Sequence, residues 1–154
     1  MLPFKKIVCP TDFSEPSNQA LEAGGELAVQ FKAELLVVHI VPQVPPVSPG
    51  IVSPRAFNVA AYQEELVKSS GDALGELIEN RLPKNLKVKP IVTQGDPADE
   101  IVHIAQVEKA DLIVIATHGL TGWRRFVFGS VAEKVVRTAR GPVLTIHPPA
   151  ESEA

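Results

Sequence analysis

The last third of the sequence holds the densest group of residues suited to binding an anion. The segment Ala116-Thr117-His118-Gly119-Leu120-Thr121-Gly122 leaves an apolar run, and Gly129-Ser130-Val131 opens a later helical pattern. Glycine lets a phosphate approach the backbone because no side chain intervenes. The free N–H groups and the dipole of a helix start also attract anions. We therefore predict an anion site here, with Arg124 and Arg125 as added positive charge.

Each of these residues also has an explanation that needs no ligand. Glycine is common in turns, so Gly119, Gly122 and Gly129 taken singly are explained by the backbone alone. Ser130 and Glu133 form an S-x-x-E capping box, which accounts for the serine. It is the combination of strand end, glycine-rich loop and Gly-Ser helix start that favours the anion site.

A second group of candidate residues follows the first two apolar runs. Pro10-Thr11-Asp12 comes directly after the first run, and Ile40 closes the second. If these runs are parallel strands, they end at the same sheet edge as the glycine-rich loop, where open α/β sheets bind ligands. The Asp12 carboxylate can accept a hydrogen bond from a ribose hydroxyl. A turn or cap before Ser14 explains this aspartate equally well.

The elements that position these residues alternate regularly. Near-continuous Val, Ile and Leu runs predict five strands buried on both faces, at 5–9, 35–40, 89–93, 112–116 and 143–146. Four helical patterns fill the gaps between them. With right-handed crossovers, this order predicts an α/β fold: a single doubly wound domain with helices on both faces of a parallel sheet.

Short signals predict the helix starts and their buried faces. Ser14 is expected to cap the first helix, Asp96-Pro97 to open the third, and the box of Ser130 and Glu133 to open the fourth. The residues expected to face the core are Tyr62, Leu66, Ala73, Leu77 and Ile78 in the second helix, and Ala132, Val135, Val136 and Ala139 in the fourth.

Standard catalytic and phosphate-binding motifs are absent from the sequence. It contains no Gly-Lys pair of a Walker A loop, no Gly-x-Gly fingerprint and no Gly-x-Ser-x-Gly elbow. The four histidines, at positions 39, 103, 118 and 147, have no metal-ligand spacing, and we expect His39 and His147 to pack or form hydrogen bonds. Only Asp12 and His118 are plausible bases, so the sequence does not predict an enzyme.

Length and charge exclude several classes of protein. The chain has 154 residues, which suits one domain, and 15 basic against 18 acidic side chains give a net charge of −3. This acidic balance, with a pI near 5.8, argues against nucleic-acid binding. The longest apolar run, 112–116, is too short to cross a bilayer, and no secretory signal follows Lys5-Lys6. Cys9 is the single cysteine, and a cytoplasmic location is expected.

Two segments depart from the regular pattern. Residues 42–57 contain five prolines, and a connection of this length is typical either of a lid or of an inserted surface loop. The polar tail, 149–154, is expected to fray. Residues 1–148 then form the predicted domain.

Nearly the whole chain resembles the universal stress protein family. The resemblance rests on Lys6-Ile7-Val8-Cys9-Pro10-Thr11-Asp12-Phe13-Ser14, Leu36-Val37-Val38-His39-Ile40 and Gly95-Asp96-Pro97-Ala98-Asp99-Glu100-Ile101. Its most specific part is Ala116-Thr117-His118-Gly119, nine residues, Gly129-Ser130, and then Gly141-Pro142-Val143-Leu144. This resemblance implies five parallel strands in the order 3-2-1-4-5 with four flanking helices. The family's ATP-binding pattern is similar to Gly-x-x-Gly, nine residues, Gly-Ser, and Ala116 replaces its first glycine.

The same resemblance implies ATP with a divalent cation, Mg²⁺ or Mn²⁺, as the ligand. Asp12 would hold the ribose beside Pro10-Thr11, and the backbone at Ile40 would meet the adenine. Residues 117–122 and 129–131 would wrap the phosphates. The family also implies a homodimer through the strand at 142–147, whose free edge would be a liability in a monomer. At most slow ATP hydrolysis is expected.

Two classes of function therefore remain open. The first is a stress-response or signalling module that binds ATP, which Gly119 and Gly129-Ser130 favour. The second is a nucleotide-independent dimer of the same family that acts through contact with a protein partner, which Ala116 favours. A receiver domain of a phosphorelay is disfavoured because Asp12 lacks an adjacent acidic residue.

Overall fold

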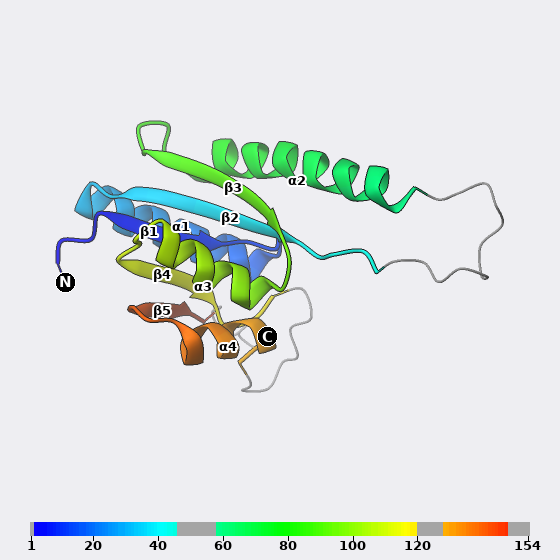
Figure 1. Cartoon of the computed structure of the whole chain (residues 1–154). Coiled ribbons are helices and arrows are strands. Elements are labelled where there is room, and N and C mark those ends of the chain that lie inside the picture. The colour runs from blue at the N-terminus through cyan, green and yellow to red at the C-terminus, as the bar shows by residue number, and fades with distance from the viewer. Residues whose placement is uncertain (1, 46–57, 120–127, 148–154) are drawn as a thin grey trace, which may run out of the picture.

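Strands and helices alternate along the chain in the computed structural model, which describes residues 2–45, 58–119 and 128–147 (Figure 1). The elements are β1 (Lys6–Pro10), α1 (Glu15–Phe31), β2 (Glu34–Val41), α2 (Val59–Arg81), β3 (Val88–Gln94), α3 (Pro97–Val107), β4 (Leu112–Ala116), α4 (Ser130–Thr138) and β5 (Val143–Ile146). Each predicted strand overlaps one of these strands.

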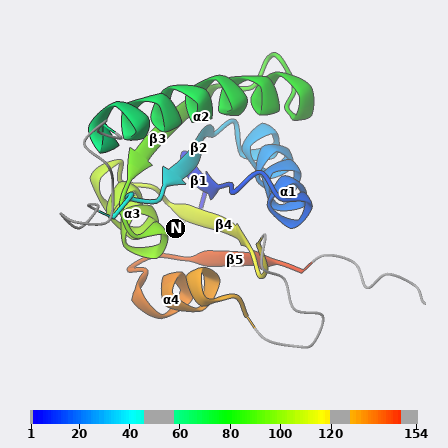
Figure 2. The same cartoon turned by 90° about the vertical axis from the view of Figure 1, so that its right-hand side faces the viewer.

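The five strands form one parallel sheet with the order β3-β2-β1-β4-β5. Helices α1 and α2 cover one face, and α3 and α4 cover the other (Figures 1 and 2). This arrangement confirms the α/β fold, the strand order and the four flanking helices that the sequence predicts.

Two apolar clusters fill the space between the sheet and its helices. Successive side chains of a strand point to opposite faces, so a continuous apolar run supplies both clusters. The cluster under α1 and α2 includes Ile7, Cys9, Leu35, Val37 and Val114, and the cluster under α3 and α4 includes Val8, Leu36, Val38, Ile113 and Ile115.

The strand order reverses between β1 and β4, and these two strands part toward their carboxyl ends. β1 pairs with β4 only at Ile7 and Val8. Pro10, the last residue of β1, has no N–H with which to extend this pairing. Such a reversal is the position at which open α/β sheets bind ligands.

Three of the four helices begin with a side-chain cap, and the fourth corrects a prediction. The side chains of Ser14, Asn58 and Asp96 cap α1, α2 and α3. In α4 the cap position belongs to Gly129, without a side-chain cap bond, and Ser130 is the first helical residue. The predicted capping box of Ser130 and Glu133 is therefore wrong: the extended backbone of Gly129, with φ −60° and ψ 150°, places the serine one position too late to act as cap.

The buried faces of α2 and α4 are narrower than predicted. In α4, Ala132 and Val135 are buried as expected, whereas Val136 is exposed. In α2, Tyr62 is exposed and the one fully buried residue is Leu74, which the sequence analysis did not single out. Both helices lie in the outer layers of a three-layer α/β/α packing, so only a narrow stripe of each reaches the core.

Some sequence expectations lie outside the described residues. These are Leu120, Thr121 and Gly122 of the predicted loop, Arg124 and Arg125, most of the proline-rich connection (46–57) and the tail from residue 148. Within the described ranges, no helix has the length and hydropathy needed to cross a membrane.

Candidate functional site

A cavity of about 320 Å³ lies at the reversal point, where β1 and β4 end. Eleven of the fourteen candidate residues named from the sequence line it: Pro10, Thr11, Asp12, Ile40, Ala116, Thr117, His118, Gly119, Gly129, Ser130 and Val131. The other three, Leu120, Thr121 and Gly122, are outside the described residues. The volume falls at the lower end of the roughly 300–1,000 Å³ typical of small-molecule pockets.

The Asp12 carboxylate is held by the start of α1 and packs against the glycine-rich loop. Its Oδ1 accepts hydrogen bonds from the backbone N–H of Ser14, at 3.0 Å, and from the Ser14 hydroxyl. Its Oδ2 lies so near Gly119 that a Cβ there would come within 2.3 Å of it. Only glycine at position 119 allows the loop and the carboxylate to lie this close together.

Thr11 is buried and joins β1 to its neighbours. Its backbone N–H donates to the carbonyl of Val38 at 2.8 Å, and its hydroxyl lies 3.0 Å from that of Ser17. The Thr11 carbonyl lies 2.9 Å from His39 Nδ1, and the His39 ring packs against Phe13 at 4.4 Å between centroids. This agrees with the expectation that His39 packs and forms hydrogen bonds.

The start of α4 sits directly on the end of β4. The Gly129 N–H donates to the Thr117 carbonyl at 2.7 Å, and a Cβ at Gly129 would lie 3.2 Å from that oxygen. The cap position of α4 is Gly129, which makes no side-chain cap bond, and the first helical residues Ser130 and Val131 line the cavity. The N–H groups of a helix start have no partner within the helix itself. The arrangement is chemically suited to a bound anion.

An ion cluster fixes α3 and α4 together beside this helix start. Lys134 Nζ lies 3.1 Å from Asp96 Oδ1 and 2.8 Å from Asp99 Oδ1. Two hydrogen bonds raise the pKa of Lys134: the bond to Asp99 has the larger effect, and the bond to Asp96 has the smaller one. The pKa of Asp96 is lowered mainly by the hydrogen bond from the backbone N–H of Asp99, and further by the hydrogen bond from Lys134. Lys134 thus orients the two helices that wall the cavity.

Two histidines meet at the buried hydroxyl of Thr117. Thr117 Oγ1 lies 3.0 Å from His118 Nδ1 and 2.8 Å from His147 Nδ1. A hydroxyl donates one proton, so at least one imidazole must donate to it. His118 Nε2 is buried and has no hydrogen-bond partner among the described residues. The hydrogen bond of His147 agrees with the expectation for that residue.

The sequence analysis missed several residues that line the cavity. They are Ser17, His39, Pro42, Pro97, Ile101, Ile115 and Ala132. Most belong to the apolar stripes of α3, α4 and β4, which signal a buried core in a sequence and give no sign that part of the stripe reaches a cavity. The sequence analysis expected His39 to pack or form hydrogen bonds, and the position of this residue in the sequence does not indicate that it lines the cavity.

Ala116 replaces the first glycine of the family pattern, and its backbone conformation is one that alanine adopts without strain. It is the last residue of β4 and pairs with Ile146 of β5 in regular strand geometry. It does not appear among the residues with a positive φ, so no glycine conformation is required at this position. Its side chain is a single methyl at the cavity wall.

The described residues do not assemble a resident metal centre. No group of three or more His, Cys, Asp or Glu side chains within them is placed to hold a metal ion. The cavity lining includes one carboxylate, that of Asp12, which is already bonded to Ser14.

Comparison with known proteins agrees with the fold. The family model described as the universal stress protein family matches residues 3–147. The chain belongs to this family. It is 36% identical over 146 residues to universal stress protein MJ0531 of Methanocaldococcus jannaschii, covering 95% of this chain and 84% of the relative. Universal stress protein MJ0577 of the same organism is 30% identical over 93% of this chain and 94% of its own length.

Solved universal stress protein structures share the architecture. The structure of MJ0577 superposes with a TM-score of 0.75, covering 94% of this chain and 96% of that chain at 28% identity. A universal stress protein solved in complex with cAMP covers 94% of this chain and 97% of its own, with a TM-score of 0.60 and 23% identity. One from Archaeoglobus fulgidus, solved with dAMP, covers 95% and 99%, with a TM-score of 0.59 and 22% identity.

Proposed function

We propose that this universal stress protein binds an adenine nucleotide, ATP with a divalent cation, in the cavity at the carboxyl ends of β1 and β4. The observation that carries the proposal is the convergence of three features on one cavity. These are the uncapped start of α4, the close approach of Gly119 to Asp12, and an apolar wall that includes Ile40.

The phosphates are assigned to the backbone around Gly119 and Gly129. The N–H groups at Ser130 and Val131 belong to a helix start, where the dipole favours negative charge. His118 supports the assignment because it lines the cavity and its buried Nε2 has no hydrogen-bond partner within the described part of the chain. Residues 120–122 complete the proposed loop, as the family pattern implies.

The nucleoside is assigned to the opposite wall of the cavity. Ile40 and Pro10 offer apolar surface to the adenine, and the backbone of Ile40 offers polar groups. Asp12 is assigned to the ribose hydroxyls because a carboxylate accepts hydrogen bonds from them. Related structures with the same fold contain cAMP and dAMP, which supports an adenine-containing ligand.

The divalent cation is assigned to the bound nucleotide. Mg²⁺ typically keeps several waters and is held through one or two carboxylates together with substrate phosphates. Such an ion neutralises phosphate charge that the described lining, which contains no lysine or arginine, does not offset. The proposed role is a signalling or stress-response module in the cytoplasm, formed by residues 1–148 and acting as a homodimer.

Calorimetric titration with Mg-ATP tests the proposal. We expect Gly129→Val to weaken binding by about tenfold or more, because its side chain enters the phosphate wall. Ser130→Ala should weaken binding by about three- to tenfold, the worth of one hydrogen bond, without the loss of stability expected of a helix cap. Ala116→Gly should bind as tightly as the wild type or more tightly.

Gly75→Ala is the matched control, because a Cβ on this α2 glycine meets nothing within 4 Å. It should bind Mg-ATP as the wild type does, and circular dichroism should show that every variant is folded. If neither the wild type nor Ala116→Gly binds Mg-ATP, the proposal is wrong. The second function, a nucleotide-independent dimer that acts through a protein partner, would then take its place.

A further inference from the structure

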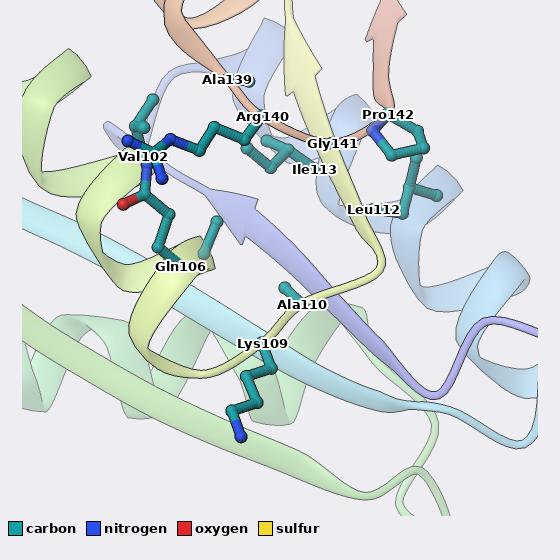
Figure 3. Close-up of a pocket in the computed structure, with 11 residues that line it drawn as sticks. Val102, Gln106, Lys109, Ala110, Leu112, Ile113, Ala139, Arg140, Gly141 and Pro142 are labelled. Atoms are coloured by element: carbon teal, nitrogen blue, oxygen red, sulfur yellow. The ribbon is translucent and has the colours of Figure 1, made fainter. Parts of the chain in front are cut away.

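A second, smaller pocket lies at the opposite end of the sheet from the nucleotide cavity (Figure 3). It has a volume of about 200 Å³ and lies among the last turns of α3, the start of β4 and the connection from α4 to β5. None of its lining residues lines the nucleotide cavity. The proposed nucleotide function does not involve it.

Small side chains leave this pocket open. Its walls include Ala105 and Ala110 from the end of α3 and Ala139 and Gly141 after α4, while Ile113 and Val102 supply larger apolar surface. A Cβ added at Gly141 would meet no atom within 4 Å. The floor of the pocket is apolar because alanine, isoleucine and valine side chains form it.

The polar side chains at the rim are two cations, Arg140 and Lys109, and the amide of Gln106. Arg140 extends from the connection after α4 toward Val102 and Gln106 of α3, and Lys109 follows the end of α3 (Figure 3). No carboxylate is among the lining residues. Within the described part of the chain, neither Arg140 nor Lys109 forms an ion pair with an acidic side chain.

The nearby acidic residues are engaged elsewhere. Glu108 bonds to Lys89 at 2.7 Å and to Lys6 at 3.2 Å. Asp111 accepts the backbone N–H groups of Lys5, at 2.7 Å, and Lys6, at 3.0 Å. The two carboxylates of the α3–β4 connection therefore do not neutralise the rim, although the whole chain is acidic.

We infer that this pocket binds a small organic carboxylate with a compact apolar body. The hydrocarbon part occupies the alanine-lined floor, and the carboxylate meets the Arg140 guanidinium, whose planar fork matches carboxylate geometry. The Gln106 amide supplies a further donor. Because the pocket is smaller than those that hold drug-sized ligands, the ligand is a short branched or aromatic acid.

Amide-resolved NMR titration of the full chain with benzoate tests the inference. We expect saturable shifts at the amides of Gln106, Lys109, Ala110 and Gly141, and the same shifts in the presence of saturating Mg-ATP. Arg140→Gln should weaken benzoate binding by about tenfold or more, because a charge-assisted hydrogen bond is lost. Arg140→Lys should restore part of it.

Benzamide is the matched probe, because it keeps the ring and removes the charge. It should bind at least about tenfold more weakly than benzoate, and Arg140→Gln should leave its binding unchanged. Equal binding of benzoate and benzamide would overturn the inference. So would benzoate shifts that gather at the nucleotide cavity, or an absence of shifts up to the solubility limit.

Discussion

Gly119 leaves no room for a side chain beside Asp12, and this close approach gives a prediction at the scale of one residue. A Cβ at position 119 would overlap Asp12 Oδ2 at 2.3 Å, so Gly119→Ala must displace the carboxylate. The proposed ribose contact and the bond from Asp12 to Ser14 move with it. We expect about tenfold weaker Mg-ATP binding and a loss of about 1–2 kcal/mol in unfolding free energy.

A double-mutant cycle separates this overlap from other effects of the alanine. In an Asp12→Ala background the carboxylate is absent, so Gly119→Ala should cost little further stability. Urea unfolding of the four proteins measures the coupling. Equal costs of Gly119→Ala in both backgrounds would show that Asp12 is not what excludes a side chain.

Cys9 gives a second prediction at this scale. The thiol is fully buried and packs near Gly24, and burial raises its pKa to about 12. Thiolate is the reactive form, so at pH 8 the folded protein should react with a thiol reagent many times more slowly than the protein in urea. Rapid labelling of the folded chain, measured by mass spectrometry, would contradict this placement of Cys9.

The residue scale also shows where the sequence was sufficient and where it was not. Eleven candidate residues line one cavity because strand ends and glycine positions are visible in the sequence. The role of Ser130 was misread because an S-x-x-E pattern does not reveal that Gly129 is already in the cap position. The apolar lining residues, such as Ile101, could not be distinguished from ordinary core.

At the scale of elements, Asp111 connects the end of α3 to the start of β1. Hydrogen bonds from the backbone N–H of Lys5 and, less strongly, of Lys6 hold the pKa of this carboxyl below its ordinary value of 3.8. A carboxyl with a lowered folded-state pKa stabilises the fold above its unfolded-state pKa. This contribution is lost as the pH falls below about 3.8 toward the folded-state value.

We therefore expect Asp111→Asn to be less stable than the wild type by about 1 kcal/mol at neutral pH, because the amide accepts more weakly than the carboxylate. The difference should shrink as the pH falls below 3.8. The pKa values of Glu108 and Asp96 are also lowered by their partners. The unfolding free energy of both proteins should therefore still fall in acid, because these two carboxyls are present in each. Urea unfolding across this pH range measures the effect, and a difference independent of pH would contradict it.

Strands were easier to predict than helix faces at this scale. The apolar run at 112–116 coincides with β4 because a strand buried on both faces is apolar at every position. The run at 143–146 coincides with β5, although this edge strand is only partly buried. Tyr62 and Val136 were misplaced because α2 and α4 contact the sheet along narrow stripes. A helical repeat of apolar residues fixes a face only to within one neighbouring position.

For the whole molecule, β5 ends the sheet and gives a prediction about assembly. The carbonyls of Pro142 and Ile146 accept from β4, so in this parallel ladder the N–H groups of Val143 and Thr145 point to the free edge. Leu144 is 39% exposed on the same strand. A two-fold pairing of this edge with a second copy would satisfy these groups.

Thr145→Pro removes one outward donor and leaves the bonds to β4 in place. If β5 is the dimer interface, this variant should be monomeric by light scattering, whereas Thr145→Val, which keeps the N–H, should remain dimeric. Circular dichroism should show the same fold for both. A dimeric Thr145→Pro would mean that another surface joins the two copies.

The central claim is that the cavity at the carboxyl ends of β1 and β4 binds Mg-ATP. Amide-resolved NMR titration of the wild-type chain with Mg-ATP tests binding and location in one measurement. The account predicts saturable shifts at the amides of Asp12, Thr117, His118, Gly119 and Val131, with the smaller pocket around Arg140 unaffected. Shifts that gather elsewhere, or none at saturating nucleotide, would contradict it.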